Sequence, residues 1–131
     1  MEYLCYHRSM RRMIAIALLI LLPLASATAA GYRRVSQEEA MRIMEKESEY
    51  VILDVRTPSE YSEKHIKGAI NIPNETIGKK EIPELPDRSQ LILVYCRSGN
   101  RSRQASAKLA SKGYTNVVEF GGIMTWKGET E

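Results

Sequence analysis

The residues that decide the fold of this chain are Val94-Tyr95-Cys96-Arg97-Ser98-Gly99-Asn100-Arg101-Ser102. The apolar run that begins at Leu91 predicts a buried strand ending at Cys96, and the residues after Gly99 predict the start of a helix. The first turn of a helix directs unpaired backbone N–H groups and the positive end of its dipole toward the residues before it. A sulfur atom held there is stabilised as an anion, so the sequence predicts a thiolate nucleophile at Cys96.

Basic residues close to Cys96 favour the same ionisation. Arg97, Arg101 and Arg103 follow it within seven positions, and a thiol that titrates near 8.5 falls to about 3.5–7.5 beside cations or at helix N-termini. A small residue such as Gly99 lets a loop close around an anion. The alternative is an inert buried cysteine, which is common among free cysteines, but that role requires neither the glycine nor the arginines. We therefore interpret the segment as an anion-binding loop.

The first thirty residues have the layout of a secretory signal peptide. Arg8, Arg11 and Arg12 precede an apolar run from Met13 to Leu24, and the small residues Ala25 to Ala30 follow. The apolar run has twelve residues, whereas a membrane-spanning helix needs about 20. We expect cleavage near the end of the small-residue stretch and export to the periplasm or another extracytoplasmic space. The alternative is an uncleaved anchor that tethers the domain to the membrane.

Removal of residues 1–30 leaves one domain, residues 31–131, with 16 basic and 15 acidic residues and a net charge of +1. This balance argues against a nucleic-acid binder, which usually has a strongly basic surface. Cys96 is the only cysteine in that range, so it forms no internal disulfide and is a candidate reactive thiol. Neither metal-ligand spacing nor a nucleotide-binding loop is present, and we expect no metal and no cofactor.

Strand and helix patterns alternate along the domain. Apolar runs predict strands at 51–55, 69–72, 91–95 and 117–120. Capping residues and periodic apolar positions predict helices at 37–47, 58–65, 101–112 and, briefly, 123–127. The prolines and charges of residues 74–90 predict a surface loop with one helical turn. This alternation predicts an α/β fold with a parallel sheet, whose ligands bind at the carboxyl ends of the strands.

Four segments of the chain resemble the rhodanese-like sulfurtransferase family in its single-domain, exported form. They are LDVRTPSEY (53–61), HIKGAINIP (65–73), the loop from Cys96 to Ser102, and GGIMTW (121–126). The resemblance extends from about Val35 to Lys127. It implies a three-layer α/β sandwich with a central, mainly parallel five-stranded sheet flanked by helices.

The resemblance also implies a thiosulfate:cyanide type of sulfurtransferase. Cys96 is expected to take a sulfane sulfur from a small anionic donor, hold it as a persulfide, and pass it to a thiol or protein acceptor, or to cyanide in vitro. Arg101 is the predicted catalytic cation, because a thiolate that attacks thiosulfate expels a dianion. The predicted substrate-binding residues of the loop are Arg97, Ser98, Gly99, Asn100 and Ser102. Asp54 and Arg56, on the neighbouring strand, are predicted to support the site.

Other functions fit parts of this pattern. Cysteine phosphatases and arsenate reductases place five residues between cysteine and arginine, whereas four separate Cys96 from Arg101. The shorter loop gives a smaller cradle, which suits one sulfur atom better than a tetrahedral oxyanion. Rhodanese-like domains also serve as scaffolds, and a sulfur carrier that does not turn over would retain Cys96. The sequence leaves the physiological donor and acceptor open.

Overall fold

The structure, a computed structural model, describes residues 31–131. The signal peptide or anchor predicted for residues 1–30 lies outside this range. Within the described range, no helix is both long enough and apolar enough to cross a membrane.

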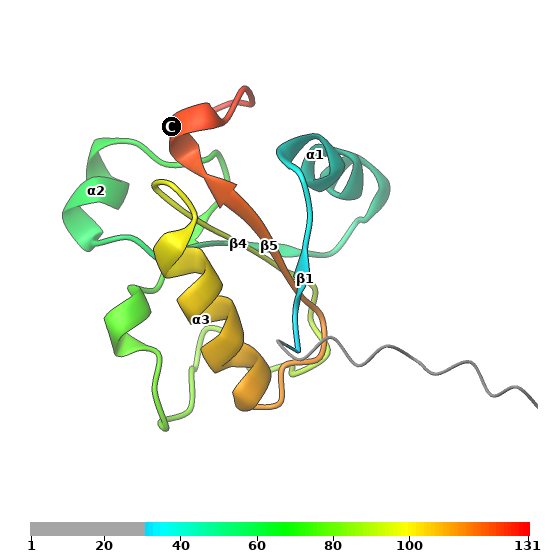
Figure 1. The fold of residues 1–131 in the computed structure, drawn as a ribbon, viewed down its shortest axis with the longest axis vertical. Coiled ribbons are helices and arrows are strands. Elements are labelled where there is room, and N and C mark those ends of the chain that lie inside the picture. The colour runs from blue at the N-terminus through cyan, green and yellow to red at the C-terminus, as the bar shows by residue number, and fades with distance from the viewer. Residues whose placement is uncertain (1–30) are drawn as a thin grey trace, which may run out of the picture.

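A five-stranded parallel sheet forms the centre of the domain (Figure 1). Its strands are β1 (Arg33–Arg34), β2 (Val51–Asp54), β3 (Ile70–Asn71), β4 (Ile92–Cys96) and β5 (Val117–Gly122), in the spatial order β1-β5-β4-β2-β3. Every neighbouring pair is parallel. The apolar pattern does not predict β1, because both of its residues are exposed arginines. The predicted α/β class and the five-stranded sheet that the resemblance implies are both confirmed.

Helices α1 (Gln37–Lys46) and α3 (Asn100–Ser111) cover opposite faces of the sheet (Figure 1). α2 (Pro58–Glu63) begins with a capping box, in which Thr57 and Glu60 exchange hydrogen bonds between side chain and backbone. This helix ends earlier than the predicted residue 65, and the predicted C-terminal helix is a single 3-10 turn, η2 (Ile123–Thr125).

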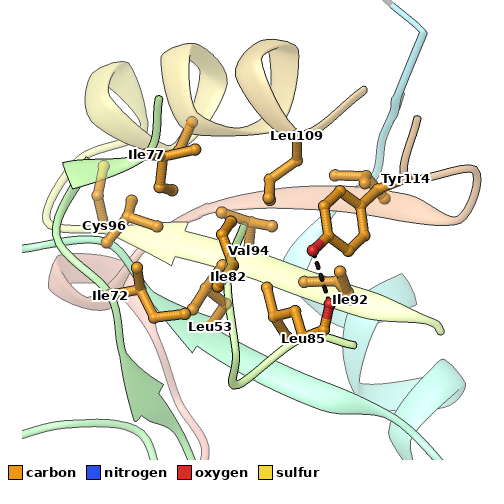
Figure 2. Packing of buried hydrophobic residues seen from close by; sticks show 13 residues of the cluster. Leu53, Ile72, Ile77, Ile82, Leu85, Ile92, Val94, Cys96, Leu109 and Tyr114 are labelled. Atoms are coloured by element: carbon orange, nitrogen blue, oxygen red, sulfur yellow. Dashed lines mark hydrogen bonds between the residues drawn. The ribbon is translucent and has the colours of Figure 1, made fainter. Parts of the chain in front are cut away.

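The sheet separates two apolar clusters, because successive side chains of a strand point to opposite faces. On the α3 face, Leu53, Val94 and Cys96 belong to one cluster with Leu109. Figure 2 shows Cys96 at the end of β4, where this cluster reaches the first turn of α3. The cluster on the α1 face includes Ala40, Leu93, Tyr95, Val118 and Phe120. Cys96 is therefore part of the core as well as the end of a strand.

The prediction of a surface loop between β3 and β4 is wrong in part, because several side chains of this segment are buried. It contains the expected helical turn, η1 (Asn74–Thr76), but the side chains of Ile77, Ile82 and Leu85 are at most 8% exposed and complete the α3-face cluster. The Tyr114 hydroxyl donates a hydrogen bond to the Leu85 carbonyl at 2.6 Å, which fixes the segment to the core (Figure 2). The spacing of these apolar residues follows neither the helical nor the strand period, so periodicity does not reveal their burial.

Candidate active site

The sulfur of Cys96 lies where β4 meets α3. Cys96 is the last residue of β4 and is 1% exposed. The Gly99 N–H donates a hydrogen bond to Sγ at 3.0 Å, and Ser102 Oγ lies 3.4 Å from Sγ. Because α3 begins at Asn100, the positive end of its dipole is directed at this position. The structure thus brings together Cys96, Gly99 and Ser102, three of the residues predicted for the site.

The surroundings of Cys96 act on the pKa of its thiol in opposite directions. Burial raises this pKa, because the charged form loses solvation. Hydrogen bonds from the Ser102 side chain and from the backbone N–H groups of Ser102, Gly99 and Ser98 lower it by more, so the pKa of Cys96 lies below its ordinary value. The loop therefore favours the thiolate.

Two glycines allow the loop to fold tightly around the sulfur. Gly99 has a φ angle of 112°, in the left-handed region that favours glycine. Gly122 pairs with Cys96 across β4 and β5 and packs so closely on the loop that a Cβ atom there would overlap the Arg97 carbonyl. The same carbonyl accepts a hydrogen bond from the Met124 N–H at 3.2 Å. These contacts fix the backbone that carries the N–H donors.

Arg101, the predicted catalytic cation, forms a two-point ion pair with Glu60 of α2. Nη1 donates to Oε1 at 2.7 Å and Nη2 donates to Oε2 at 3.0 Å. Hydrogen bonding to Arg101 lowers the pKa of Glu60 to about 2. The pair raises the pKa of Arg101, and the charge of Cys96 contributes in the same direction. The guanidinium of Arg101 is therefore held by Glu60, which neutralises part of its charge.

Asp54 and Arg56 form a buried network at the carboxyl end of β2, the strand beside β4. Arg56 Nη2 donates to Asp54 Oδ2 at 2.7 Å, and both side chains are at most 7% exposed. The Tyr95 hydroxyl donates to the same carboxylate oxygen at 2.7 Å and accepts from the Ile66 N–H at 3.0 Å. Arg56 also donates to the Lys64 carbonyl at 2.6 Å. The network is tied to β4 through Tyr95, whose side chain packs on the opposite face of the sheet from Cys96, so the supporting role of Asp54 and Arg56 stays a prediction.

The other predicted substrate-binding residues, Arg97, Ser98 and Asn100, are exposed. A hollow of about 480 Å³ borders the loop, and its lining comprises Arg56, Glu60, Glu63, Lys64, Arg97, Ile123 and Met124. It combines charges of both signs with apolar side chains. Among residues 31–131, no group of three or more metal-ligating side chains is placed to hold a metal ion.

Sequence motifs miss two glutamates of the site. Glu119 of β5 is 2% exposed, and its Oε1 accepts hydrogen bonds from Ser102 Oγ at 2.7 Å and from the Gly121 N–H at 2.9 Å. An acidic residue inside an apolar strand is a signal that could have identified it, because a buried carboxylate needs partners. Glu60 is recognisable as a helix-capping residue, but only the fold shows its pairing with Arg101, 41 residues away.

Comparisons with known proteins agree with this geometry. Residues 36–129 match the family model described as a rhodanese-like domain. Thiosulfate sulfurtransferase PspE of Escherichia coli K12 is 39% identical over 71 residues, which cover 54% of this chain and 68% of PspE. The putative sulfur carrier protein YrkF of Bacillus subtilis is 30% identical over 108 residues, which cover 82% of this chain and 57% of YrkF.

Solved structures include a rhodanese with anions from E. coli that is 34% identical to this chain. The two superpose with a TM-score of 0.58, and the match covers 63% of this chain and 96% of that rhodanese. The family match, the sequence relatives and the shared fold confirm the resemblance to the rhodanese-like family, whereas export stays a prediction. This chain belongs to the rhodanese-like domain family.

Proposed function

We propose that the domain is a sulfurtransferase that moves a sulfane sulfur from a small anionic donor, such as thiosulfate, through a Cys96 persulfide to a thiophilic acceptor. The observation that carries the proposal is the 3.0 Å hydrogen bond from the Gly99 N–H to Cys96 Sγ at the start of α3. Donors placed there stabilise negative charge on sulfur without reorganising during the reaction. The similarity to the thiosulfate sulfurtransferase PspE supports the choice of donor.

The proposed reaction has two steps that balance in atoms and charge. In the first, the Cys96 thiolate attacks the outer sulfur of thiosulfate, the S–S bond of the donor breaks, and sulfite leaves with the bonding electron pair. The negative charge moves from Sγ to the terminal sulfur of the persulfide. In the second, an acceptor such as cyanide attacks that terminal sulfur, thiocyanate leaves, and the Cys96 thiolate is restored.

The charged residues take different parts in this proposal. Arg97 is exposed beside the hollow at the loop and attracts the anionic donor. Arg101, fixed by Glu60, stabilises the charge that develops on the departing sulfite. Asp54 and Arg56 hold the neighbouring strand end in place and do not react.

Intact mass spectrometry of residues 31–131 tests the proposal directly. After treatment with thiosulfate we expect a mass gain of one sulfur atom, and after cyanide the loss of that mass with release of thiocyanate. The Cys96→Ala variant is the control, because it keeps an apolar side chain in the core and removes only the sulfur. Loading of this variant would contradict the assigned nucleophile.

A sulfur carrier without turnover is the second candidate. Two observations favour it: Cys96 is only 1% exposed, and the putative sulfur carrier YrkF is similar over most of this chain. The same measurement separates the two functions. Slow or absent loading by thiosulfate, together with loading by polysulfide or by a persulfidated partner protein, would favour the carrier. Loading by none of these would indicate a binding module.

We also propose that the domain acts outside the cytoplasm, because residues 1–30 have the layout of a signal peptide. Its partners are then a small anionic sulfur donor and a thiol or protein acceptor in that compartment. Fractionation of cells that express the full chain, followed by N-terminal sequencing, tests this. A cleaved form in the periplasm supports export, a full-length form in the membrane indicates an anchor, and a cytosolic form overturns the proposal.

A further inference from the structure

Glu119 is a buried carboxylate beside the sulfur that the proposed reaction does not use. Its side chain is 3% exposed. The Ser102 hydroxyl lies between the two groups, with Oγ 2.7 Å from Glu119 Oε1 and 3.4 Å from Cys96 Sγ. The Gly121 N–H donates to Oε1 at 2.9 Å, and Arg34 Nε donates to Oε2 at 3.4 Å. Burial of a carboxylate is costly, and this one is a single hydroxyl away from the reactive thiol.

The Ser102 hydroxyl has one hydrogen and more than one acceptor around it. It lies within donating distance of Glu119, of the Gly99 carbonyl at 2.9 Å and of the Cys96 sulfur. An ionised Glu119 only accepts hydrogen bonds, so it competes with the thiolate for this hydrogen. While Ser102 donates to Glu119, Sγ retains only the backbone N–H donors, and a thiol at Cys96 donates to Ser102 Oγ. The two anions therefore oppose each other through one shared hydroxyl.

We propose that Glu119 is an electrostatic positioning residue, whose buried charge, coupled to Cys96 through Ser102, disfavours negative charge on Sγ and favours its displacement to the outer sulfur of the persulfide. In the unloaded thiolate the charge is on Sγ, next to Ser102. In the persulfide Sγ is neutral and the charge lies one bond farther out. Repulsion between like charges is strong in a poorly solvated site, so Glu119 stabilises the loaded state relative to the unloaded state.

Other charges face this pair from the surrounding elements. Arg34 of β1 and Arg103 of α3 line one hollow with Glu119. Arg97 adjoins Cys96 in the chain and lines a second hollow with Glu60, and the charge of Cys96 contributes to raising the pKa of Arg101. Arg34 is 63% exposed, so it offsets only part of the Glu119 charge. Arg33 precedes it in the same strand, is also exposed, and lines a different hollow beside α1. The chain thus offers a matched control for charge removal at Arg34.

A thiolate titration of the unloaded domain tests the coupling without any sulfur transfer. Its result is independent of the proposed function on which the inference rests. We expect Glu119→Gln, which is isosteric and neutral, to bring thiolate absorbance and alkylation by iodoacetamide to a pH about one unit lower than in the wild type. Arg34→Gln exposes more of the Glu119 charge and should shift the titration upward by a smaller amount at low ionic strength. Arg33→Gln should leave it unchanged.

The loading equilibrium with thiosulfate and sulfite tests the second half of the inference. At a pH above the thiolate titration of every variant, E119Q should lower the ratio of persulfide to thiolate by about fivefold, because the unloaded state is no longer disfavoured. An E119Q titration equal to the wild type, or shifted upward, overturns the proposal, as does an unchanged loading ratio. R34Q leaves every buried side chain in place, so this variant tests the coupling even if E119Q does not fold. If the thiolate of Cys96 titrates at the same pH in R34Q as in R33Q, the proposed coupling to Glu119 is overturned.

Discussion

Arg101 at the start of α3 and Glu60 in α2 are joined by two parallel hydrogen bonds, at 2.7 Å and 3.0 Å, across 41 residues of sequence. The same carboxylate caps α2 by accepting from the Thr57 N–H and hydroxyl. One glutamate therefore caps the start of α2 and fixes the side chain of Arg101 in the first turn of α3. The ion pair fixes the position of the guanidinium and neutralises part of its charge. The sulfur of Cys96 is held separately, by the backbone N–H of Gly99.

We expect Arg101→Ala to lower kcat/KM for thiosulfate by roughly 30-fold, which corresponds to about 2 kcal/mol of lost transition-state stabilisation. The loss lies at the low end for a charged group because Glu60 already neutralises part of the guanidinium. Arg101→Lys keeps the charge but loses the two-point geometry, so its kcat/KM should lie between that of the wild type and that of R101A. Steady-state kinetics with thiosulfate and cyanide provide the measurement. If R101A had the kcat/KM of the wild type, Arg101 would not stabilise the departing sulfite.

Glu60 should make the stability of the domain depend on pH in acid. Its pKa is about 2 in the folded state, chiefly because of the hydrogen bonds from Arg101, whereas an unfolded chain has a glutamate pKa of about 4.3. A lowered carboxyl pKa stabilises the fold above the unfolded value, and this contribution is lost as pH falls from there through the folded value. Glu60→Gln lacks it. In urea unfolding, the difference between wild type and E60Q should be largest above pH 5 and shrink toward pH 2.

The exposed Glu63 of the same helix supplies the control for that experiment. Glu63→Gln changes the net charge equally, so a difference from the wild type with the same pH dependence would show that charge alone, and not the pairing with Arg101, explains the effect.

The sequence predicts the elements that carry their own signals. The apolar run up to Cys96, the capping box at Thr57 and Glu60, and Gly99 before α3 all act locally, and all lie where the sequence places them. Strand β1 is missed because both of its residues are exposed arginines, and the backbone pairing with β5 leaves no apolar pattern in the sequence. The buried side chains of Ile77 and Leu85 are missed because the segment around them has no regular period.

The candidate site divides in the same way. Cys96, Gly99 and Ser102 are close in sequence, so their spacing predicts their contact. The partners Glu60 and Glu119 come from other elements, and their contacts depend on how α2 and β5 are placed against the loop. Electrostatic coupling between distant segments is a property of the fold, and no local pattern encodes it.

Asp54→Ala should destabilise the domain by about 3–5 kcal/mol, because it leaves the buried Arg56 guanidinium without its carboxylate. Tyr95→Phe removes one donor to Asp54 and the acceptor of the Ile66 N–H, and should cost a smaller amount, about 1–3 kcal/mol. Denaturant unfolding at pH 7 measures both. A loss below about 1 kcal/mol for D54A would mean that Arg56 reaches solvent once released, and that the network does not brace the strand end.

Gly122→Ala should disable the site through its backbone. A Cβ atom at this position would overlap the Arg97 carbonyl and the Ser98 nitrogen, which belong to backbone that cannot rotate aside as a flexible side chain would. The loop must shift, and the N–H groups that hold the Cys96 sulfur shift with it, so persulfide loading should slow by about 100-fold. Gly78→Ala is the matched control, because nothing lies within 4 Å of a Cβ atom there. Loading rates by intact mass spectrometry compare the two variants, with circular dichroism to confirm folding. If G122A folded and loaded at the wild-type rate, the close packing of β5 on the loop would not be what positions the sulfur.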